Sequence, residues 1–198
     1  MTKLDKFNKR SFDVFLSIIG ILVFSPIIIF FWLLIFISSG SNGFFFQERV
    51  GMNGRIFRLV KLKTMKNVNG KNQHITIKSD IRITKLGSFL RKYKMDELPQ
   101  IYNVFVGQMS IVGPRPDVRG YADRLKGENR LILSVRPGIT GPASIKYKNE
   151  EEILDSEANP QIYNDEVIWP DKVRINTNYV KNWSLIRDLY YIFATFKN

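Results

Sequence analysis

An uncharged apolar run of 23 residues, Phe15–Ile37, dominates the N-terminal part of the chain. As a helix rising ~1.5 Å per residue, it would be ~35 Å long, enough to cross the hydrocarbon core of a bilayer. A cleaved signal peptide is disfavoured, because signal-peptide apolar regions are usually only ~7–15 residues long and no Ala-x-Ala site follows the run. The run therefore predicts a membrane anchor.

Ser25 and Pro26 lie near the middle of this run and predict a break in the helix. Proline lacks a backbone N–H and clashes with the preceding turn, while a serine hydroxyl can bond a freed carbonyl. Each half would then cover only about half of the bilayer. Cations flank the run on both sides, so the charge asymmetry that orients a spanning helix is missing. Two alternatives stay open: a kinked spanning helix, and a re-entrant hairpin with both ends on the cytoplasmic face.

Composition limits the chemistry of the remaining chain. There are 30 Lys and Arg residues against 18 Asp and Glu, a formal charge of +12, no cysteine and one histidine, His74. These counts exclude a thiolate nucleophile, a disulfide framework, cysteine-ligated zinc and a histidine-rich metal site. The positive charge predicts a polyanionic partner, which could be nucleic acid, an anionic membrane face or a phosphorylated small molecule. Any catalysis would depend on carboxylates, Lys, Arg, hydroxyls and a hard metal ion.

The pattern after the anchor predicts a helix-rich α+β domain. Strands are expected at 44–47 and 56–63 around a Gly51–Gly54 turn, and helices at 81–94, from Met95 onward, near 118–126 and at 179–196. Loops punctuated by Gly and Pro are expected at 107–116 and 136–142. The 149–171 segment holds eight acidic and no basic residues, which predicts an acidic surface excursion and leaves about +20 on the rest of the chain. We expect an anchor, 1–40, and a catalytic domain, 41–198.

Adjacent carboxylates, Asp96 and Glu97, interrupt a cationic stretch at an expected helix start. One interpretation is structural, because acids in a first helical turn stabilise the helix by ~0.5–2 kcal/mol. The other is chemical: a carboxylate nucleophile with a neighbouring acid or metal ligand, as phosphoryl chemistry uses. Nearby cations would keep such an aspartate ionised.

Two arginines lie in proline-stiffened turns, Arg115 before Pro116 and Arg136 before Pro137. A fixed backbone lowers the entropy cost of presenting the planar guanidinium, which binds phosphate oxygens in a bidentate fashion. For each turn taken alone, a solvated arginine is the favoured interpretation. Because both turns occur in one chain with an acid pair and a membrane run, a functional role for the two arginines is favoured over a purely structural one.

Several strings together resemble the bacterial sugar transferase family, and more narrowly its small monotopic phosphoglycosyl transferases. The strings are the Ser25-Pro26 break, FQERVG at 46–51, KLKTM at 61–65, MDELPQ at 95–100, MSIVGPRP at 109–116 and RPGITG at 136–141. The resemblance extends from about Lys9 to Phe196 and favours the re-entrant hairpin.

The resemblance implies transfer of a sugar 1-phosphate from a UDP-sugar to undecaprenyl phosphate, with release of UMP. Asp96 would be the covalent nucleophile and a ligand of Mg²⁺, assisted by Glu97. Substrates would be held by five further residues: Lys63, Arg91, Arg115, Pro116 and Arg136. Arg91 would bind the polyprenyl phosphate, and Arg115 with Arg136 would engage the phosphates or uridine of the donor.

The expected fold is thus α+β and helix-rich: an N-terminal re-entrant membrane helix-break-helix, followed by a small cytoplasmic catalytic domain with interfacial amphipathic helices. The expected location is the cytoplasmic face of the bacterial inner membrane, in contact with its phospholipid. No nucleic-acid partner is expected, and the oligomeric state is open, with a homodimer among the alternatives. The competing hypothesis is a non-catalytic, membrane-tethered basic protein that binds nucleic acid or anionic lipid.

Overall fold

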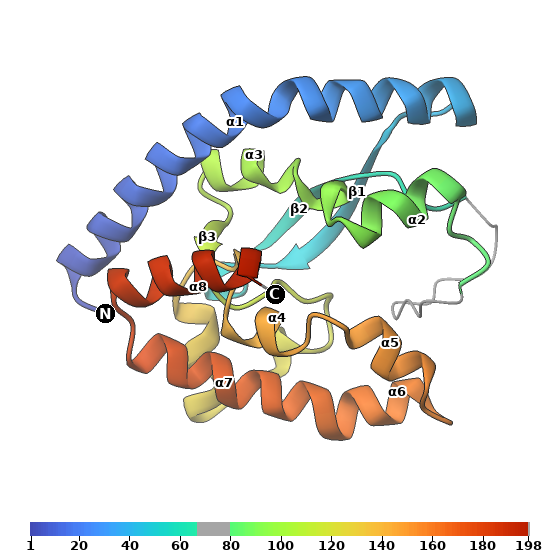
Figure 1. Ribbon diagram of the computed structural model, residues 1–198. Coiled ribbons are helices and arrows are strands. Elements are labelled where there is room, and N and C mark those ends of the chain that lie inside the picture. Colours follow the sequence, from blue (N-terminus) through green and yellow to red (C-terminus); the bar gives the residue numbers. More distant parts are fainter. Residues whose placement is uncertain (67–79, 198) are drawn as a thin grey trace.

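The computed structural model describes residues 1–66 and 80–197, so that His74 lies outside the described residues. It confirms a helix-rich α+β chain: one long helix runs beside a small domain of short helices and two two-stranded sheets (Figure 1). The α-helices are α1 (Lys3–Ser39), α2 (Lys85–Lys92), α3 (Gln100–Phe105), α4 (Pro142–Lys146), α5 (Glu150–Asp155), α6 (Pro160–Tyr163), α7 (Trp169–Lys181) and α8 (Leu185–Lys197).

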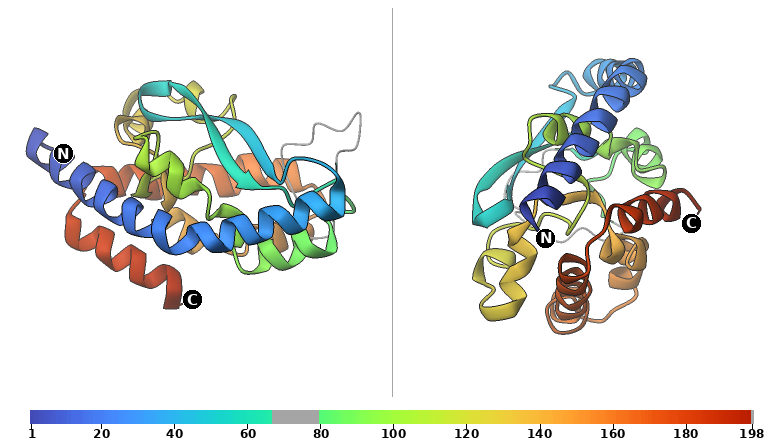
Figure 2. Two further views of the ribbon diagram at one scale, coloured as in Figure 1. Left: turned by 90° about the horizontal axis from the view of Figure 1, so that it is seen from above. Right: turned by 90° about the vertical axis from the view of Figure 1, so that its left-hand side faces the viewer.

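Helix α1 is a single continuous helix, whereas two helices joined by a break were expected. Thr2 and Asp5 form a capping box at its start, and Gly40 ends it in the left-handed conformation at φ 60°. Pro26 leaves the Leu22 carbonyl without its helical donor, and the Ser25 hydroxyl donates to the neighbouring carbonyl of Ile21. The helix bends near its middle without folding back on itself (Figures 1 and 2). A bend costs less than a break, because the remaining backbone hydrogen bonds are kept.

The parts of α1 before and after Pro26, here called its first and second arms, both pack on the rest of the protein. On the first arm, a Cβ at Gly20 would lie 2.9 Å from the Ile101 side chain, so that α1 and α3 approach closely there. On the second arm, Ile35 is buried in a cluster with Leu62 and Leu90. The outer face is apolar and exposed along the whole run, as at Leu22 and Ile37. Within the described residues, α1 is the one helix whose length and composition suit a membrane crossing.

Strands β1 (Phe44–Val50) and β2 (Ile56–Leu62) form the expected antiparallel hairpin. Phe44 pairs with Leu62 at the open end, next to the end of α1, and Val50 pairs with Ile56 at the turn. The turn is a short 3₁₀ segment, η1 (Met52–Gly54). The hairpin therefore runs from the end of α1 to the centre of the domain.

A second sheet occupies the two segments that were expected to be loops. Strands β3 (Ser110–Val112) and β4 (Gly138–Thr140) are parallel, and Ser110 pairs with Gly138. A Cβ added at Gly138 would lie 2.1 Å from the Gly113 nitrogen, so only glycine allows the two backbones to come this close. The pairing brings the two Arg-Pro turns side by side.

The acidic 149–171 segment forms α5, α6, a π-helical turn and the start of α7, and it packs on the domain through the buried side chains of Leu154 and Ile168. The rest of the C-terminal part differs from expectation in two places. The helix expected near 118–126 is reduced to one 3₁₀ turn. The helix expected at 179–196 is split at Asn182 into α7 and α8. The remaining short segments are η3 (Ala122–Arg124), η4 (Gly127–Ser134) and η5 (Asn164–Ile168).

Helices α1, α2 and α8 lie along one side of the molecule, as the view from above shows (Figure 2). Phe31 of α1 contacts Phe89 of α2 at a ring-centroid distance of 6.2 Å. Large exposed apolar side chains continue this face on the shorter helices, as at Phe89 of α2 and at Tyr190 and Phe193 of α8. The amphipathic helices thus extend the apolar face of α1.

Candidate active site

The acid pair lies on its own short turn between two helices. Lys94 follows α2 with φ 54°, a left-handed conformation that costs a non-glycine residue roughly 1 kcal/mol. It turns the chain into a 3₁₀ segment, η2 (Met95–Glu97), and α3 begins only after Pro99. The expected helix start at Met95 is therefore wrong by five residues. Both acids are buried, with 5% of Asp96 and 9% of Glu97 exposed.

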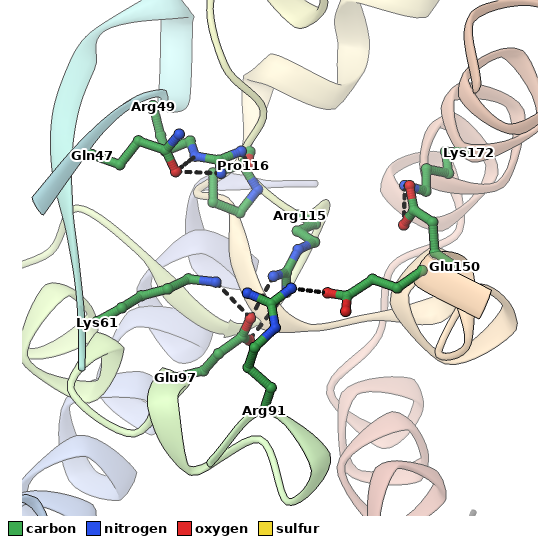
Figure 3. A network of polar contacts seen from close by, with 10 residues as sticks. Gln47, Arg49, Lys61, Arg91, Glu97, Arg115, Pro116, Glu150 and Lys172 are labelled. Carbon is green, nitrogen blue, oxygen red and sulfur yellow. Dashed lines mark hydrogen bonds and ion pairs between the residues drawn. The ribbon is translucent and has the colours of Figure 1, made fainter. Parts of the chain in front are cut away.

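Glu97 is fully committed to two cations (Figure 3). Lys61 Nζ lies 2.8 Å from its Oε1. Arg115 donates from Nη2 to Oε1 at 2.5 Å and from Nη1 to Oε2 at 3.1 Å. Burial alone would favour the neutral acid, but Arg115 and Lys61 hold the pKa of Glu97 well below its usual range. Glu97 is therefore an anion that fixes the arginine fork.

Asp96 is the available member of the pair. Within the described parts of the chain, no side chain or backbone group hydrogen-bonds to its carboxylate. Burial raises the pKa of Asp96, Lys61 opposes that rise, and Glu97 adds to it. Arg91 and Lys94 add further positive charge nearby and favour the ionised form. Asp96 is thus a buried carboxylate, surrounded by cations and free to act on a ligand.

Arg91 reaches this centre from α2. Its Nη2 lies 2.5 Å from Glu151 Oε1, which comes from α5, and its side chain is 19% exposed. The acidic segment thus supplies a counter-ion at the site. Lys172 of α7 pairs with the neighbouring Glu150 at 2.6 Å (Figure 3).

Pro116 lies on the other side of Arg115. It is buried, and its carbonyl accepts a hydrogen bond of 3.1 Å from Arg49 Nη1. A small hollow lies beside these residues, and its walls are mostly apolar. It is lined by Val50, Gly51, Pro114, Arg115, Pro116, Asp117, Ala122, Ile132, Leu133, Val135 and Pro137. The hollow therefore lies next to the Arg115 end of the charged cluster.

The structure does not bring Lys63 or Arg136 to the acid pair. Lys63 lies beyond the end of β2, and its Nζ donates to Ser41 Oγ at 3.0 Å in the turn after α1. Arg136 Nε donates to the Gly107 carbonyl at 2.8 Å, just past the end of α3. Carbonyls at a helix C-terminus have no helical donors and attract cations, and Arg10 takes the Val104 and Phe105 carbonyls there.

Sequence reasoning missed Lys61 as a site residue, although a signal was present. Along β2 the buried side chains Phe57 and Leu59 alternate with exposed ones, and Lys61 continues their buried face. A lysine on the inner face of a strand needs an anionic partner, and Glu97 is that partner. No local signal pointed to Glu151, which meets Arg91 across 60 positions of sequence.

The donor groups fit the Mg²⁺ that the resemblance implies. Within the described residues, no three acidic or histidine side chains gather to form a metal cage. Mg²⁺ does not need one, because it is usually held by one or two carboxylates together with substrate phosphates and water. The free carboxylate of Asp96 matches that requirement.

Comparisons with known proteins identify the family of the chain. Residues 4–198 match the family model described as bacterial sugar transferase. The exopolysaccharide production protein ExoY of Sinorhizobium fredii is 33% identical over 204 residues, covering 95% of this chain and 83% of that protein. An undecaprenyl-phosphate galactose phosphotransferase of Salmonella typhimurium is 32% identical, covering 97% of this chain and 40% of that protein. An Aeromonas hydrophila UDP-N-acetylgalactosamine-undecaprenyl-phosphate N-acetylgalactosaminephosphotransferase is 32% identical, covering 96% of this chain and 43% of that protein.

Proposed function

Because the chain belongs to the bacterial sugar transferase family, we propose that it transfers a sugar 1-phosphate from a UDP-sugar to undecaprenyl phosphate. Its family and the names of its relatives make it a glycosyl-1-phosphate transferase. The product would be an undecaprenyl-diphosphate-sugar, the first lipid-linked step of surface glycan assembly. The observation that carries the proposal is one free buried carboxylate, Asp96, beside an acid that is fully paired.

In the first half-reaction, Asp96 attacks the sugar-proximal phosphorus of the donor. A bond forms from its carboxylate oxygen to phosphorus, and the bond from phosphorus to the bridging oxygen breaks, so that UMP leaves with that oxygen. Lys61 and Arg115 keep Glu97 ionised and in place, and their positive charge offsets the clustered phosphate charge. Asp96 would hold Mg²⁺ together with the donor phosphates, whose charge the ion would neutralise when bound.

In the second half-reaction, an oxygen of undecaprenyl phosphate attacks the phosphosugar on Asp96. The acyl-phosphate bond breaks, a diphosphate forms, and the Asp96 carboxylate is regenerated. Arg91 would hold the incoming lipid phosphate, which replaces the Glu151 carboxylate as its partner. Division into two steps lets one set of cations serve two polyanionic substrates in turn.

The anchor would be re-entrant, with both ends on the cytoplasmic face of the inner membrane. The first arm of α1 is tied to the domain by Lys9, and the second by Ile35 in the cluster with Leu62. A helix held to one domain at both ends keeps both ends on the side of that domain. The shared apolar face of α1, α2 and α8 would lie in the phospholipid interface.

A UMP-release assay tests the function. The full chain, in detergent or nanodiscs, is given undecaprenyl phosphate and a panel of UDP-sugars that includes N-acetylated amino sugars, with and without Mg²⁺. We expect Mg²⁺-dependent release of UMP with at least one donor and a lipid-linked product. A well-folded sample that is inactive with every donor would contradict the proposal.

A further inference from the structure

Arg49 of β1 is a cation near the site that has only neutral partners. Its Nε and Nη2 donate to Gln47 Oε1 at 3.1 and 2.6 Å, and its Nη1 donates to the Pro116 carbonyl at 3.1 Å (Figure 3). The side chain is partly buried, and burial lowers the pKa of the guanidinium to about 10, with Arg115 adding to that effect and Asp117 and Glu97 opposing it. Neither acid is in ion-pair contact with Arg49, so the charge is only partly compensated and the position suits an anionic ligand.

The neighbouring cations differ from Arg49 in this respect. Each of them touches a carboxylate: Lys61 and Arg115 touch Glu97, Arg91 touches Glu151, and Lys172 touches Glu150. Within the described parts of the chain, no carboxylate lies within ion-pair distance of Arg49. Of these five cations, Arg49 alone keeps its charge free of a contacting acid.

The position of Arg49 relative to Asp96 indicates which anion it would meet. Glu97 contacts Arg115, and the next residue, Pro116, holds Arg49 through its carbonyl. The cations thus extend from the nucleophile toward the hollow that Pro116 and Val50 line. A diphosphate whose sugar-proximal phosphorus lies at Asp96 would place its second phosphate along this direction.

We propose that Arg49 binds the nucleotide-proximal phosphate of the donor, the group that departs as UMP. The inference rests on the proposed function and adds a residue to its donor site. A guanidinium has five N–H donors, and the bonds to Gln47 and Pro116 use three of them, which leaves two for phosphate oxygens. The departing phosphate gains negative charge as its bond to the transferred phosphorus breaks, so a fixed cation there stabilises the leaving group.

The alternative is that Arg49 only clamps β1 to the turn around Pro116. A clamp would affect folding and both substrates alike, whereas a phosphate contact affects the nucleotide side alone. The experiment therefore compares inhibition by UMP with the KM for undecaprenyl phosphate, using transfer of radiolabelled sugar phosphate into lipid as the readout.

For Arg49→Gln, we expect the inhibition constant of UMP to rise about tenfold or more, because a charge-assisted contact is lost. The KM for undecaprenyl phosphate should stay within about twofold, since nothing changes on the lipid side. Arg119→Gln is the matched control, because Arg119 lies on the surface with 62% of its side chain exposed and pairs with Glu48, the residue before Arg49. It should leave both constants unchanged.

Arg49→Lys is a second variant in case Arg49→Gln does not fold. It keeps the positive charge and loses only the planar, bidentate set of N–H donors. It should raise the inhibition constant of UMP about threefold. An unchanged inhibition constant in whichever variant folds, or equal effects on both substrates, would overturn the inference. Wild-type protein that neither turns over any UDP-sugar nor responds to UMP would instead overturn the proposed function, so the two failures are distinguishable.

Discussion

The Nζ atom of Lys9 lies 2.5 Å from Oδ2 of Asp188, in a buried ion pair that joins α1 to α8. Asp188 is completely buried and also accepts hydrogen bonds from the Tyr179 hydroxyl at 2.7 Å and from Trp183 Nε1 at 3.0 Å. Asp13, one turn further along α1, accepts from the Ser110 hydroxyl at 2.9 Å. The first arm of the anchor is therefore held to the catalytic domain by buried polar contacts.

Loss of this ion pair should destabilise the protein and free the first arm. Lys9→Met leaves Asp188 as an uncompensated buried charge, which typically costs about 3–5 kcal/mol. We expect a clear fall in melting temperature in detergent. Lys6→Met removes the same charge from an exposed position in the same helix and should have little effect. Adding Asp188→Asn to Lys9→Met should restore part of the lost stability; a further fall would show that the pair is not the source of the effect.

Replacement of Pro26 should favour a straight, spanning helix. Leucine restores the missing backbone donor to the Leu22 carbonyl and removes the clash. Because the chain has no cysteine, Thr2→Cys gives a single label site at its N-terminus. An impermeant thiol reagent applied to intact cells should label it from outside in Pro26→Leu, most strongly when combined with Lys9→Met, and not in the parent. Ser25→Ala, which keeps the proline, should shift labelling much less. External labelling of the parent would refute the re-entrant anchor.

Lys61, not Lys63, should be the lysine on which turnover depends. Lys61→Gln leaves Glu97 with Arg115 as its one cation and removes positive charge near Asp96. We expect kcat/KM to fall roughly 10- to 100-fold, the range of one to two charge-assisted contacts. Lys63→Gln removes a side chain that follows β2 and contacts Ser41, and it should cost much less. Equal losses in the two variants would contradict the geometry of β2.

Ionisation of Asp117 should make the protein less stable as pH rises. Burial raises its pKa to about 6, with Lys172 and Arg49 opposing the rise, Glu150 adding to it and Arg115 opposing it. The native state then binds more protons than the unfolded state between about pH 4 and 6, so stability falls through that window and levels off above it.

Asp117→Asn removes that dependence. The free energy of unfolding of the variant minus that of wild type should be about 1–3 kcal/mol larger at pH 7.5 than at pH 4. Thermal melts at the two pH values measure the difference. The same wild-type–variant difference at both pH values would show that Asp117 does not titrate in this range.

Part of this fold could be predicted from local pattern. Local sequence patterns are sufficient to identify the apolar run, the β1–β2 hairpin and the acid pair. The break between α7 and α8 was also marked, because Ser184 caps α8 by accepting from the Arg187 N–H, and serine is a preferred helix cap. The aromatic stripe over 179–196 nevertheless favours one continuous helix.

The rest depends on contacts that no local pattern encodes. Strands β3 and β4 are three residues long, too short for a periodic signal, and they pair because Gly113 and Gly138 allow close approach. The resemblance assigns Arg136 to the donor phosphates, and no local pattern predicts that its Nε donates to the Gly107 carbonyl just past the end of α3. The Arg91–Glu151 pair depends on where α5 lies relative to α2, which no local pattern predicts. Long-range packing thus decides which of many cations belong to the site.

The covalent step at Asp96 is tested most directly without acceptor. The full chain is incubated with a UDP-sugar that it turns over, in the absence of undecaprenyl phosphate, and UMP and intact mass are followed together. We expect a burst of about one UMP per protein and a matching sugar-phosphate adduct on the peptide that contains Asp96, both abolished in Asp96→Asn and discharged by added undecaprenyl phosphate. Release of UMP only when acceptor is present, with no adduct, or an undiminished burst in Asp96→Asn, would contradict Asp96 as the nucleophile.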